Sequence, residues 1–244
     1  MNTFGVCQYV HLNHYILNIQ VLYEDNHLIA VSKPPGILVQ GDATGDPTLA
    51  DWVKQYIKDR YNKPGAVFLG IVHRLDRPVS GVVIFARTTK ALKRMNEMFR
   101  DRKITKSYWA ITKNRPEKLS GELVHYLVKD STKNKVKAYE RPNRKRPNAK
   151  KAELSYKTAG VLGSHSFLEV NPITGRPHQI RVQLASMDCI IKGDLKYGAD
   201  SPGPEGGIYL HCHCLEFIHP VKKEPVKICT DAPNWQMWRE FGLV

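Results

Sequence analysis

Short apolar runs bounded by turn residues recur along most of this chain, and such runs predict β-strands. Residues 21–23 and 28–32 predict a hairpin, and its second strand ends at a Pro-Pro-Gly turn. Two further runs, around residues 71–72 and at 82–86, flank a turn rich in charged residues. Later strands are expected at residues 107–112, 123–128, 152–159, 166–170, 208–217 and 226–230.

Helical spacing of apolar residues is found in fewer places. Residues 48–61 carry a stripe with i, i+3, i+4 and i+7 spacing, and Asp46 with Pro47 would supply a cap and a first-turn proline. Because strands outnumber helices and short turns join them, we expect an α+β fold: a mixed, mostly antiparallel sheet with flanking helices. The stripe consists of Leu49, Trp52, Val53, Tyr56 and Ile57. Further helices are expected at residues 89–101, 177–186 and 233–241.

The charged turn contains one carboxylate, Asp76, between Arg74 and Arg77. A nearby cation favours the ionised form of an aspartate, so this carboxylate would be ready to act as a nucleophile or a base. An aspartate that only organises its turn through its side chain is the commoner case. The local residues alone do not decide between these two interpretations.

Composition indicates a polyanionic partner. Lysine and arginine number 37 against 23 acidic residues among 244, a formal net charge of +14, which exceeds what solubility needs and favours nucleic acid. Nine of the nineteen residues from 133 to 151 are Lys or Arg, including Arg144, Lys145 and Arg146. This basic segment is either a solvated insertion between strands or an arm that grips RNA phosphates.

Several classes of protein are not expected. The chain lacks an apolar run of about 18 residues, so we predict no membrane span. The N-terminus lacks the basic start and apolar core of a signal peptide. Five scattered cysteines predict reduced thiols in a cytoplasmic protein rather than a disulfide framework. The histidines and cysteines at residues 211–214 would alternate between the faces of a strand, so we expect no metal site.

Residues 73–81, His-Arg-Leu-Asp-Arg-Pro-Val-Ser-Gly, resemble the signature of the RluA family of RNA pseudouridine synthases. The family pattern is His-Arg-Leu-Asp, two residues, then Thr-Ser-Gly, and this chain has Val79 at the position of the threonine. Residues 21–39 resemble the opening strand pair and Lys-Pro-x-Gly turn of the family. Residues 174–185 resemble its third motif, which is followed by the similar stretch 191–198, Ile-Lys-Gly-Asp-Leu-Lys-Tyr-Gly. Three ordered motifs make the resemblance specific, and it extends over about residues 21–230.

The resemblance implies an enzyme that isomerises uridines to pseudouridine in structured RNA, either ribosomal RNA or tRNA, after flipping the base from its stack. It implies Asp76 as the catalytic carboxylate, Tyr108 as the tyrosine that packs against the target base, and Arg181 as the arginine that pairs with the carboxylate. No redox or phosphate chemistry occurs, so no cofactor is required. The motifs do not decide whether Asp76 attacks the sugar, attacks the base or assists departure of the uracil.

The same resemblance suggests residues that contact RNA. Arg74 matches the family position that fills the space left by the flipped base, and its planar cation suits stacking and phosphate binding. We expect Arg77, His73 and His178 to face RNA or to support the structure around it. On its helix Arg181 lies away from the apolar stripe, which by itself predicts a solvated arginine.

We expect an N-terminal extension at residues 1–20, a catalytic domain at 21–244 with the basic insertion at 133–151, and a monomer. The alternative is a catalytically inactive RNA-binding or ribosome-assembly protein on the same fold. The presence of Asp76, Arg74, Tyr108 and Arg181 argues against an inactive protein. A glycosidase would need a second carboxylate near the first, and the motif offers none.

Overall fold

The computed structural model describes residues 7–12, 15–42 and 44–244. The chain forms two compact units. Unit 1 comprises Met1–Ile104 with Cys214–Thr230, and unit 2 comprises Thr105–His213 with Asp231–Val244. Each unit therefore combines segments that are distant in the sequence.

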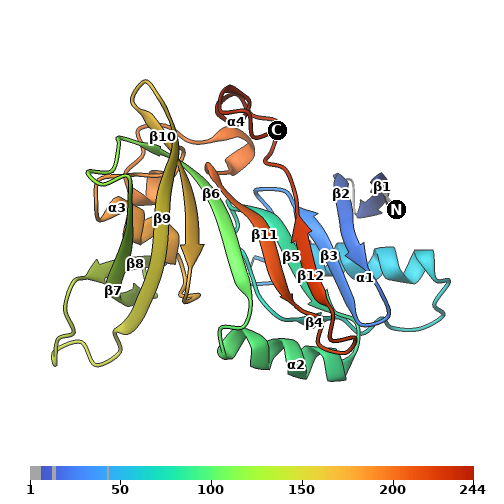
Figure 1. The fold of residues 1–244 in the computed structure, drawn as a ribbon. Helices are drawn as coiled ribbons and strands as arrows, with labels where there is room; N and C mark the ends of the chain where they lie inside the picture. The colour runs from blue at the N-terminus through green and yellow to red at the C-terminus, as the bar shows by residue number, and fades with distance from the viewer. Residues whose placement is uncertain (1–6, 13–14, 43) are drawn as a thin grey trace. The chain divides into compact units, whose positions relative to one another are not determined.

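Unit 1 is built on an antiparallel sheet. Its strands are β1 (Cys7–Leu12), β2 (Tyr15–Glu24), β3 (Leu28–Lys33), β4 (Gly70–Ile71), β5 (Ser80–Ala86), the end of β11 (Leu210–Ile218) and β12 (Pro225–Cys229). They are ordered β1-β2-β3-β5-β11, with β12 paired to β11 and β4 paired to β5 (Figure 1). All seven residues of β5 are buried, so this strand lies in the core of the unit.

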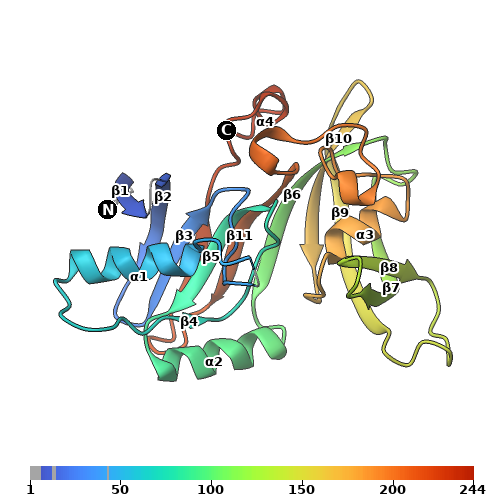
Figure 2. The same cartoon turned by 180° about the vertical axis from the view of Figure 1, so that it is seen from behind.

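Two helices flank this sheet, α1 (Leu49–Arg60) and α2 (Thr89–Arg100), and Figure 2 shows α1 across one face of it. The apolar stripe predicted for α1 is confirmed, because all five of its residues are buried. The predicted cap is wrong: the hydroxyl of Thr48 accepts from the backbone N–H of Asp51 at 3.2 Å, and the Asp51 carboxylate accepts from that of Thr48 at 3.1 Å. This reciprocal pair begins the helix at Leu49, so Pro47 lies before the cap rather than in the first turn.

Unit 2 holds a second run of antiparallel strands. They are β6 (Thr105–Lys113), β7 (Ser120–Asp130), β8 (Lys135–Tyr139), β9 (Lys150–Leu162) and β10 (His165–Pro172), in the order β6-β10-β9-β7-β8, with the start of β11 beside β6. Helix α3 (Gln179–Ala185) packs on this sheet, because its Val182 is buried with Leu127, Val136 and Ala152. The remaining elements are the 3₁₀ turns η1 (Leu195–Tyr197) and η2 (Pro204–Gly206) and the helix α4 (Gln236–Glu240).

The predicted α+β class is confirmed, with flanking helices on antiparallel strands. The predicted elements are present with ends shifted by a few residues, and β1 and β8 are additions that the apolar pattern did not predict. Strand β2 runs without interruption through residues 20 and 21. The boundary expected there, between an N-terminal extension and the catalytic domain, stays a prediction. Among the described residues, no helix is both long and apolar enough to cross a membrane.

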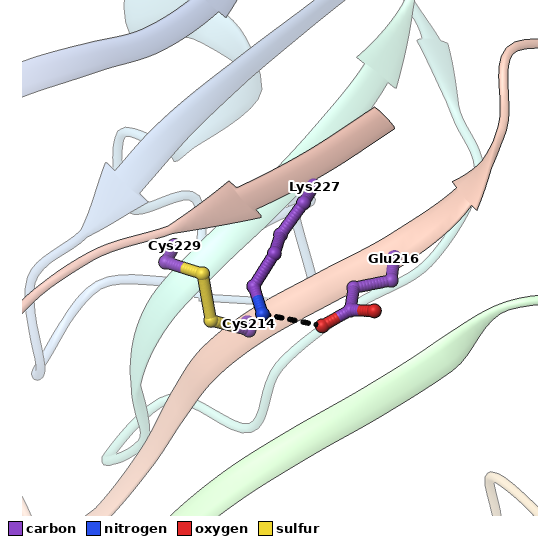
Figure 3. The surroundings of a disulfide bond; sticks show 4 residues. All are labelled: Cys214, Glu216, Lys227 and Cys229. Carbon is purple, nitrogen blue, oxygen red and sulfur yellow. Dashed lines mark ion pairs between the residues drawn. A yellow bond between two sulfur atoms is a disulfide. The ribbon is translucent and has the colours of Figure 1, made fainter. Parts of the chain in front are cut away.

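The predicted reduced state of the cysteines is wrong for one pair. Cys214 and Cys229 lie directly opposite each other on β11 and β12, with their Cα atoms 4.2 Å apart, and form a disulfide (Figure 3). The neighbouring pair of Glu216 and Lys227, also opposite in register, makes an ion pair of 2.9 Å. The sequence does not specify which strands pair or in what register, so it could not identify this cross-strand bond.

Candidate active site

Asp76 lies in unit 1, in the turn that joins β4 to β5. The backbone N–H of Val79 donates to the carbonyl of Asp76 at 3.0 Å and closes this turn. The backbone N–H of Gly36 donates to the carbonyl of Arg77 at 2.9 Å and ties it to the loop after β3. The half-buried Asp76 is therefore carried by a turn with defined backbone partners, as its position between two strands predicted.

Lys33, at the end of β3, holds the same turn from inside the protein. Its ammonium donates to the carbonyl oxygens of Pro34, Arg77 and Val79 at 2.9, 3.1 and 2.7 Å, and none of its side chain is exposed. Burial lowers the pKa of Lys33 to about 7, while the Asp76 carboxylate acts in the opposite direction. Lys33 was not predicted as a site residue from the sequence, although a lysine at the end of an apolar strand was a signal.

The other charged residues of the turn differ in their surroundings. The Arg77 guanidinium donates from Nε to the carbonyl of Gly36 at 2.9 Å and pairs with Asp46 at 2.9 Å, yet 49% of its side chain is exposed. His73 accepts the backbone N–H of Ile84 at its Nε2 atom at 3.0 Å, and its ring stacks on a phenylalanine of α2. Arg74 is exposed. The two arginines thus have surface available for a ligand.

Arg181 lies in unit 2 on α3 and is buried, with 5% of its surface exposed. Its Nε and Nη2 atoms donate to the two carboxylate oxygens of Asp194 at 2.7 and 2.8 Å, and Asp194 itself is 1% exposed. The prediction of a solvated arginine is therefore wrong, because a buried carboxylate compensates its charge. Helical periodicity carries no information about a partner thirteen residues away.

Tyr197 brings two of the predicted residues together in unit 2. Its hydroxyl lies 2.9 Å from Nδ1 of His178, and its ring centroid lies 5.2 Å from the guanidinium carbon of Arg181. His178 precedes α3 with a positive φ of 52°, and its ring meets that of Tyr197 edge to face. Neither Tyr197 nor Asp194 was predicted as a site residue, although both belong to the Ile-Lys-Gly-Asp-Leu-Lys-Tyr-Gly stretch that resembles the family.

Tyr108 is half-buried on β6, opposite Val170 of β10. Its neighbour Trp109 stacks on His213, with 3.6 Å between ring centroids, and meets Phe167 edge to face. Successive residues of a strand point to opposite faces, so Tyr108 lies on the other face from this aromatic cluster. Tyr108 and Trp109 therefore serve different faces of β6.

The basic segment, residues 133–151, is more structured than a simple loop insertion. Its residues 135–139 form β8, which pairs with β7. Beyond β8, the guanidinium carbon of Arg146 lies 3.7 Å from the ring centroid of Tyr139, which places this cation over the ring. Arg144 and Lys145 are exposed, and the backbone N–H of Lys145 donates to the side chain of Asn143 at 2.8 Å. The basic segment therefore presents exposed cations from a strand paired to β7 and from the residues that follow it, which contact one another.

The candidate residues thus fall into a group in each unit. Unit 1 holds Asp76 and its neighbours on a turn braced by Lys33. Unit 2 holds Arg181 and His178 around Tyr197, together with Tyr108 and the basic segment. In chemical terms the first group offers a carboxylate, and the second offers a preoriented guanidinium and a phenol.

Comparisons with known proteins agree with the sequence motifs. A family model described as RNA pseudouridylate synthase matches residues 27–186. The chain is 33% identical over 236 residues to ribosomal large subunit pseudouridine synthase D of Xylella fastidiosa, which covers 88% of this chain. It is 35% identical over 198 residues to the mitochondrial pseudouridylate synthase RPUSD4 of Xenopus tropicalis, which covers 74% of this chain. These two alignments span 66% and 60% of the relatives, less than two thirds of their length.

A solved structure shows the same fold. Human RNA pseudouridylate synthase domain containing 4 superposes with a TM-score of 0.72 at 26% identity, and the match covers 88% of each chain. The chain therefore shares the fold of this solved structure. The family-model match includes Asp76, Tyr108 and Arg181.

Proposed function

Because the chain belongs to the RNA pseudouridylate synthase family, we propose that it isomerises uridines to pseudouridine in structured RNA. The observation that carries this proposal is the family match, which runs through the Asp76 turn and through the helix of Arg181. The alternative, an inactive RNA-binding protein on the same fold, is disfavoured by the contacts that brace both residues. Such contacts keep catalytic groups in one geometry.

The reaction needs a precisely placed carboxylate. It breaks the N-glycosidic bond between N1 and C1′ of a uridine, turns the uracil and joins C5 of the base to C1′ of the sugar; C5 loses a proton and N1 gains one. Substrate and product are isomers, so no external oxidant or group donor enters the balance. We propose Asp76 as the carboxylate, acting on the sugar, on the base or in departure of the uracil. Its turn, held by Lys33, would restrict its position during the reaction.

We further propose Tyr108 and Arg181 as catalytic residues. The resemblance assigns Tyr108 to the target base, and this residue is half-buried on β6. The two hydrogen bonds from Arg181 to Asp194 support a guanidinium that is oriented before the substrate arrives. A preoriented cation needs little rearrangement when charge develops in the transition state.

The proposed partner is structured RNA, either ribosomal RNA or tRNA, bound by a monomer in the cytoplasm. The names of the bacterial relatives make large-subunit ribosomal RNA the first substrate to test. The net charge of +14 supports binding to a polyanion. We propose that the contacts to RNA come from His73, Arg74, Arg77, His178, Arg144, Lys145 and Arg146.

A single assay separates these possibilities. The purified protein is incubated with transcripts of ribosomal RNA and tRNA, and pseudouridine is detected by its stable chemical adduct and by release of tritium from C5-labelled uridine. The proposed function predicts conversion at defined uridines. If the protein binds RNA tightly but forms no pseudouridine in any transcript or in total RNA, the inactive RNA-binding protein is supported instead. Mapping pseudouridines in RNA from a deletion strain would then identify the natural uridine.

A further inference from the structure

We propose that Tyr197 is a positioning residue that joins the basic segment to Arg181. The inference rests on the proposed role of Arg181 and adds a residue that no motif assigned to catalysis. It concerns unit 2 alone, where α3, η1 and the start of β8 meet around one phenol ring.

On one side, the turn that carries Tyr197 holds Arg181. Asp194 accepts two hydrogen bonds from the Arg181 guanidinium, and three residues later the Tyr197 ring lies 5.2 Å from the guanidinium carbon. The backbone N–H groups of Tyr197 and Ala199 donate to the carbonyl of Asp194 at 3.0 and 3.1 Å. One tight turn therefore presents the carboxylate and the aromatic ring that together orient the arginine.

On the other side, the same turn holds the start of the basic segment. The backbone N–H of Val136 donates to the Tyr197 hydroxyl at 3.0 Å, and the ammonium of Lys135 lies 5.4 Å from the ring centroid. Next to it, the ammonium of Lys196 donates to the carbonyl of Asn134 at 2.9 Å. The first residues of the basic segment are thus attached to η1 by backbone as well as side-chain contacts.

The hydroxyl of Tyr197 contacts both the basic segment and the start of α3. Because it accepts the N–H of Val136, its own proton is available to Nδ1 of His178, 2.9 Å away at the start of α3. The ring is shared in the same way, between Lys135 of the basic segment and Arg181 of α3. A force that RNA exerts on the start of β8 therefore has a path to α3 through Tyr197, in addition to the direct packing of Val136 on Val182.

The hydroxyl and the ring of Tyr197 have separable effects, which two variants of Tyr197 and one control variant would test. Tyr197→Phe keeps the ring and removes the hydroxyl, so KM for RNA should rise about fivefold while kcat stays within about twofold. Tyr197→Leu also removes the ring, so kcat should fall about tenfold in addition to the change in KM. Leu195→Ala changes an exposed residue of the same turn, 56% of whose surface is accessible, and should leave both constants unchanged.

A second readout keeps the inference independent of the proposed function. The side-chain Nε–H resonance of Arg181, observed by ¹⁵N NMR of the free protein, should shift and exchange faster in Tyr197→Leu but not in Leu195→Ala. Were no RNA converted by the wild type, the proposed function would fail and this resonance would still test the positioning role. Should Tyr197→Leu fail to fold, the split between KM and kcat in Tyr197→Phe decides. Wild-type kinetics in both tyrosine variants, with an unmoved Arg181 resonance, would overturn the inference.

Discussion

The ammonium group of Lys33 donates a 2.7 Å hydrogen bond to the carbonyl oxygen of Val79, inside unit 1 and out of contact with solvent. Val79 stands three residues after Asp76, on the turn that carries the proposed catalytic carboxylate. Lysine is seldom fully buried, because removing its charge from water is costly unless hydrogen bonds compensate. The position of Asp76 therefore depends on a lysine that no substrate needs to touch.

Lys33→Met should weaken both the fold and the reaction. The substitution keeps the length of the side chain but removes the ammonium that donates to the carbonyls of Pro34, Arg77 and Val79; the Arg77 carbonyl keeps the N–H of Gly36. Loss of partners for buried polar groups should lower the free energy of unfolding by about 3 kcal/mol. Chemical denaturation checks this value, and Lys58→Met, on the exposed face of α1, is the matched control. An equal effect of both substitutions would contradict the role of Lys33.

The pKa of Lys33 predicts a specific dependence of stability on pH. Burial lowers this pKa to about 7 in the folded protein, whereas an unfolded lysine titrates near pH 10.4. Between these values the unfolded chain binds a proton that the folded chain has released, so the free energy of unfolding should rise with pH. The slope from this group is at most about 1.4 kcal/mol per pH unit. Subtracting the profile of Lys33→Met isolates it, and identical profiles would rule out a depressed pKa.

The buried pair of Arg181 and Asp194 should be more costly to break than to replace. Asp194→Asn removes the buried carboxylate that accepts two hydrogen bonds from the guanidinium and should reduce the free energy of unfolding by about 3–5 kcal/mol. Adding Arg181→Met to Asp194→Asn should recover part of this loss, because the buried guanidinium that had lost the Asp194 carboxylate is then removed as well. Pseudouridine formation should not recover in the double variant, since Arg181 is absent. Additive losses of stability would show that the two residues act independently.

Neutralising the basic segment should weaken binding to all RNAs alike. Replacing Arg144 and Lys145 by Ser should reduce the slope of log K against log salt by about 0.7–0.9 for each phosphate that the segment no longer binds. Turnover at saturating RNA should barely change, because these phosphates are bound equally strongly before and during the reaction. Lys54→Ser with Lys58→Ser removes the same charge from α1 and serves as the control. An unaltered salt slope would mean that the segment is only a solvated hairpin.

Sequence pattern predicted the fold class and most elements for a physical reason. The predicted strands carry contiguous apolar runs, such as the fully buried β5, and the predicted helix α1 carries apolar residues at helical spacing. Strand β8 was missed because Lys135 and Lys137 interrupt its apolar pattern, and pairing with β7 supplies the order instead. The Cys214–Cys229 bond was missed because register across a hairpin is a tertiary property.

The candidate site was predicted only in part. Motifs located Asp76, Tyr108 and Arg181, and their catalytic roles stay predictions. The residues that hold them were not located, because Lys33 acts through carbonyl oxygens and Asp194 through a partner on another element. Support of this kind depends on contacts between distant segments, which one sequence does not reveal. Burial of a charged residue, visible only in the fold, was the sign that identified both.

The central claim is that Asp76 carries out the isomerisation, and Asp76→Asn tests it most directly. The amide keeps the size of the side chain and removes its charge, so RNA binding should stay within about tenfold, or 1.4 kcal/mol, of the wild type. Asp59→Asn, an exposed change on α1, controls for the chemistry of the substitution. We predict that tritium release from C5-labelled uridine in bound RNA disappears in Asp76→Asn and persists in Asp59→Asn. Turnover by Asp76→Asn above a few per cent of the wild-type rate would contradict the account.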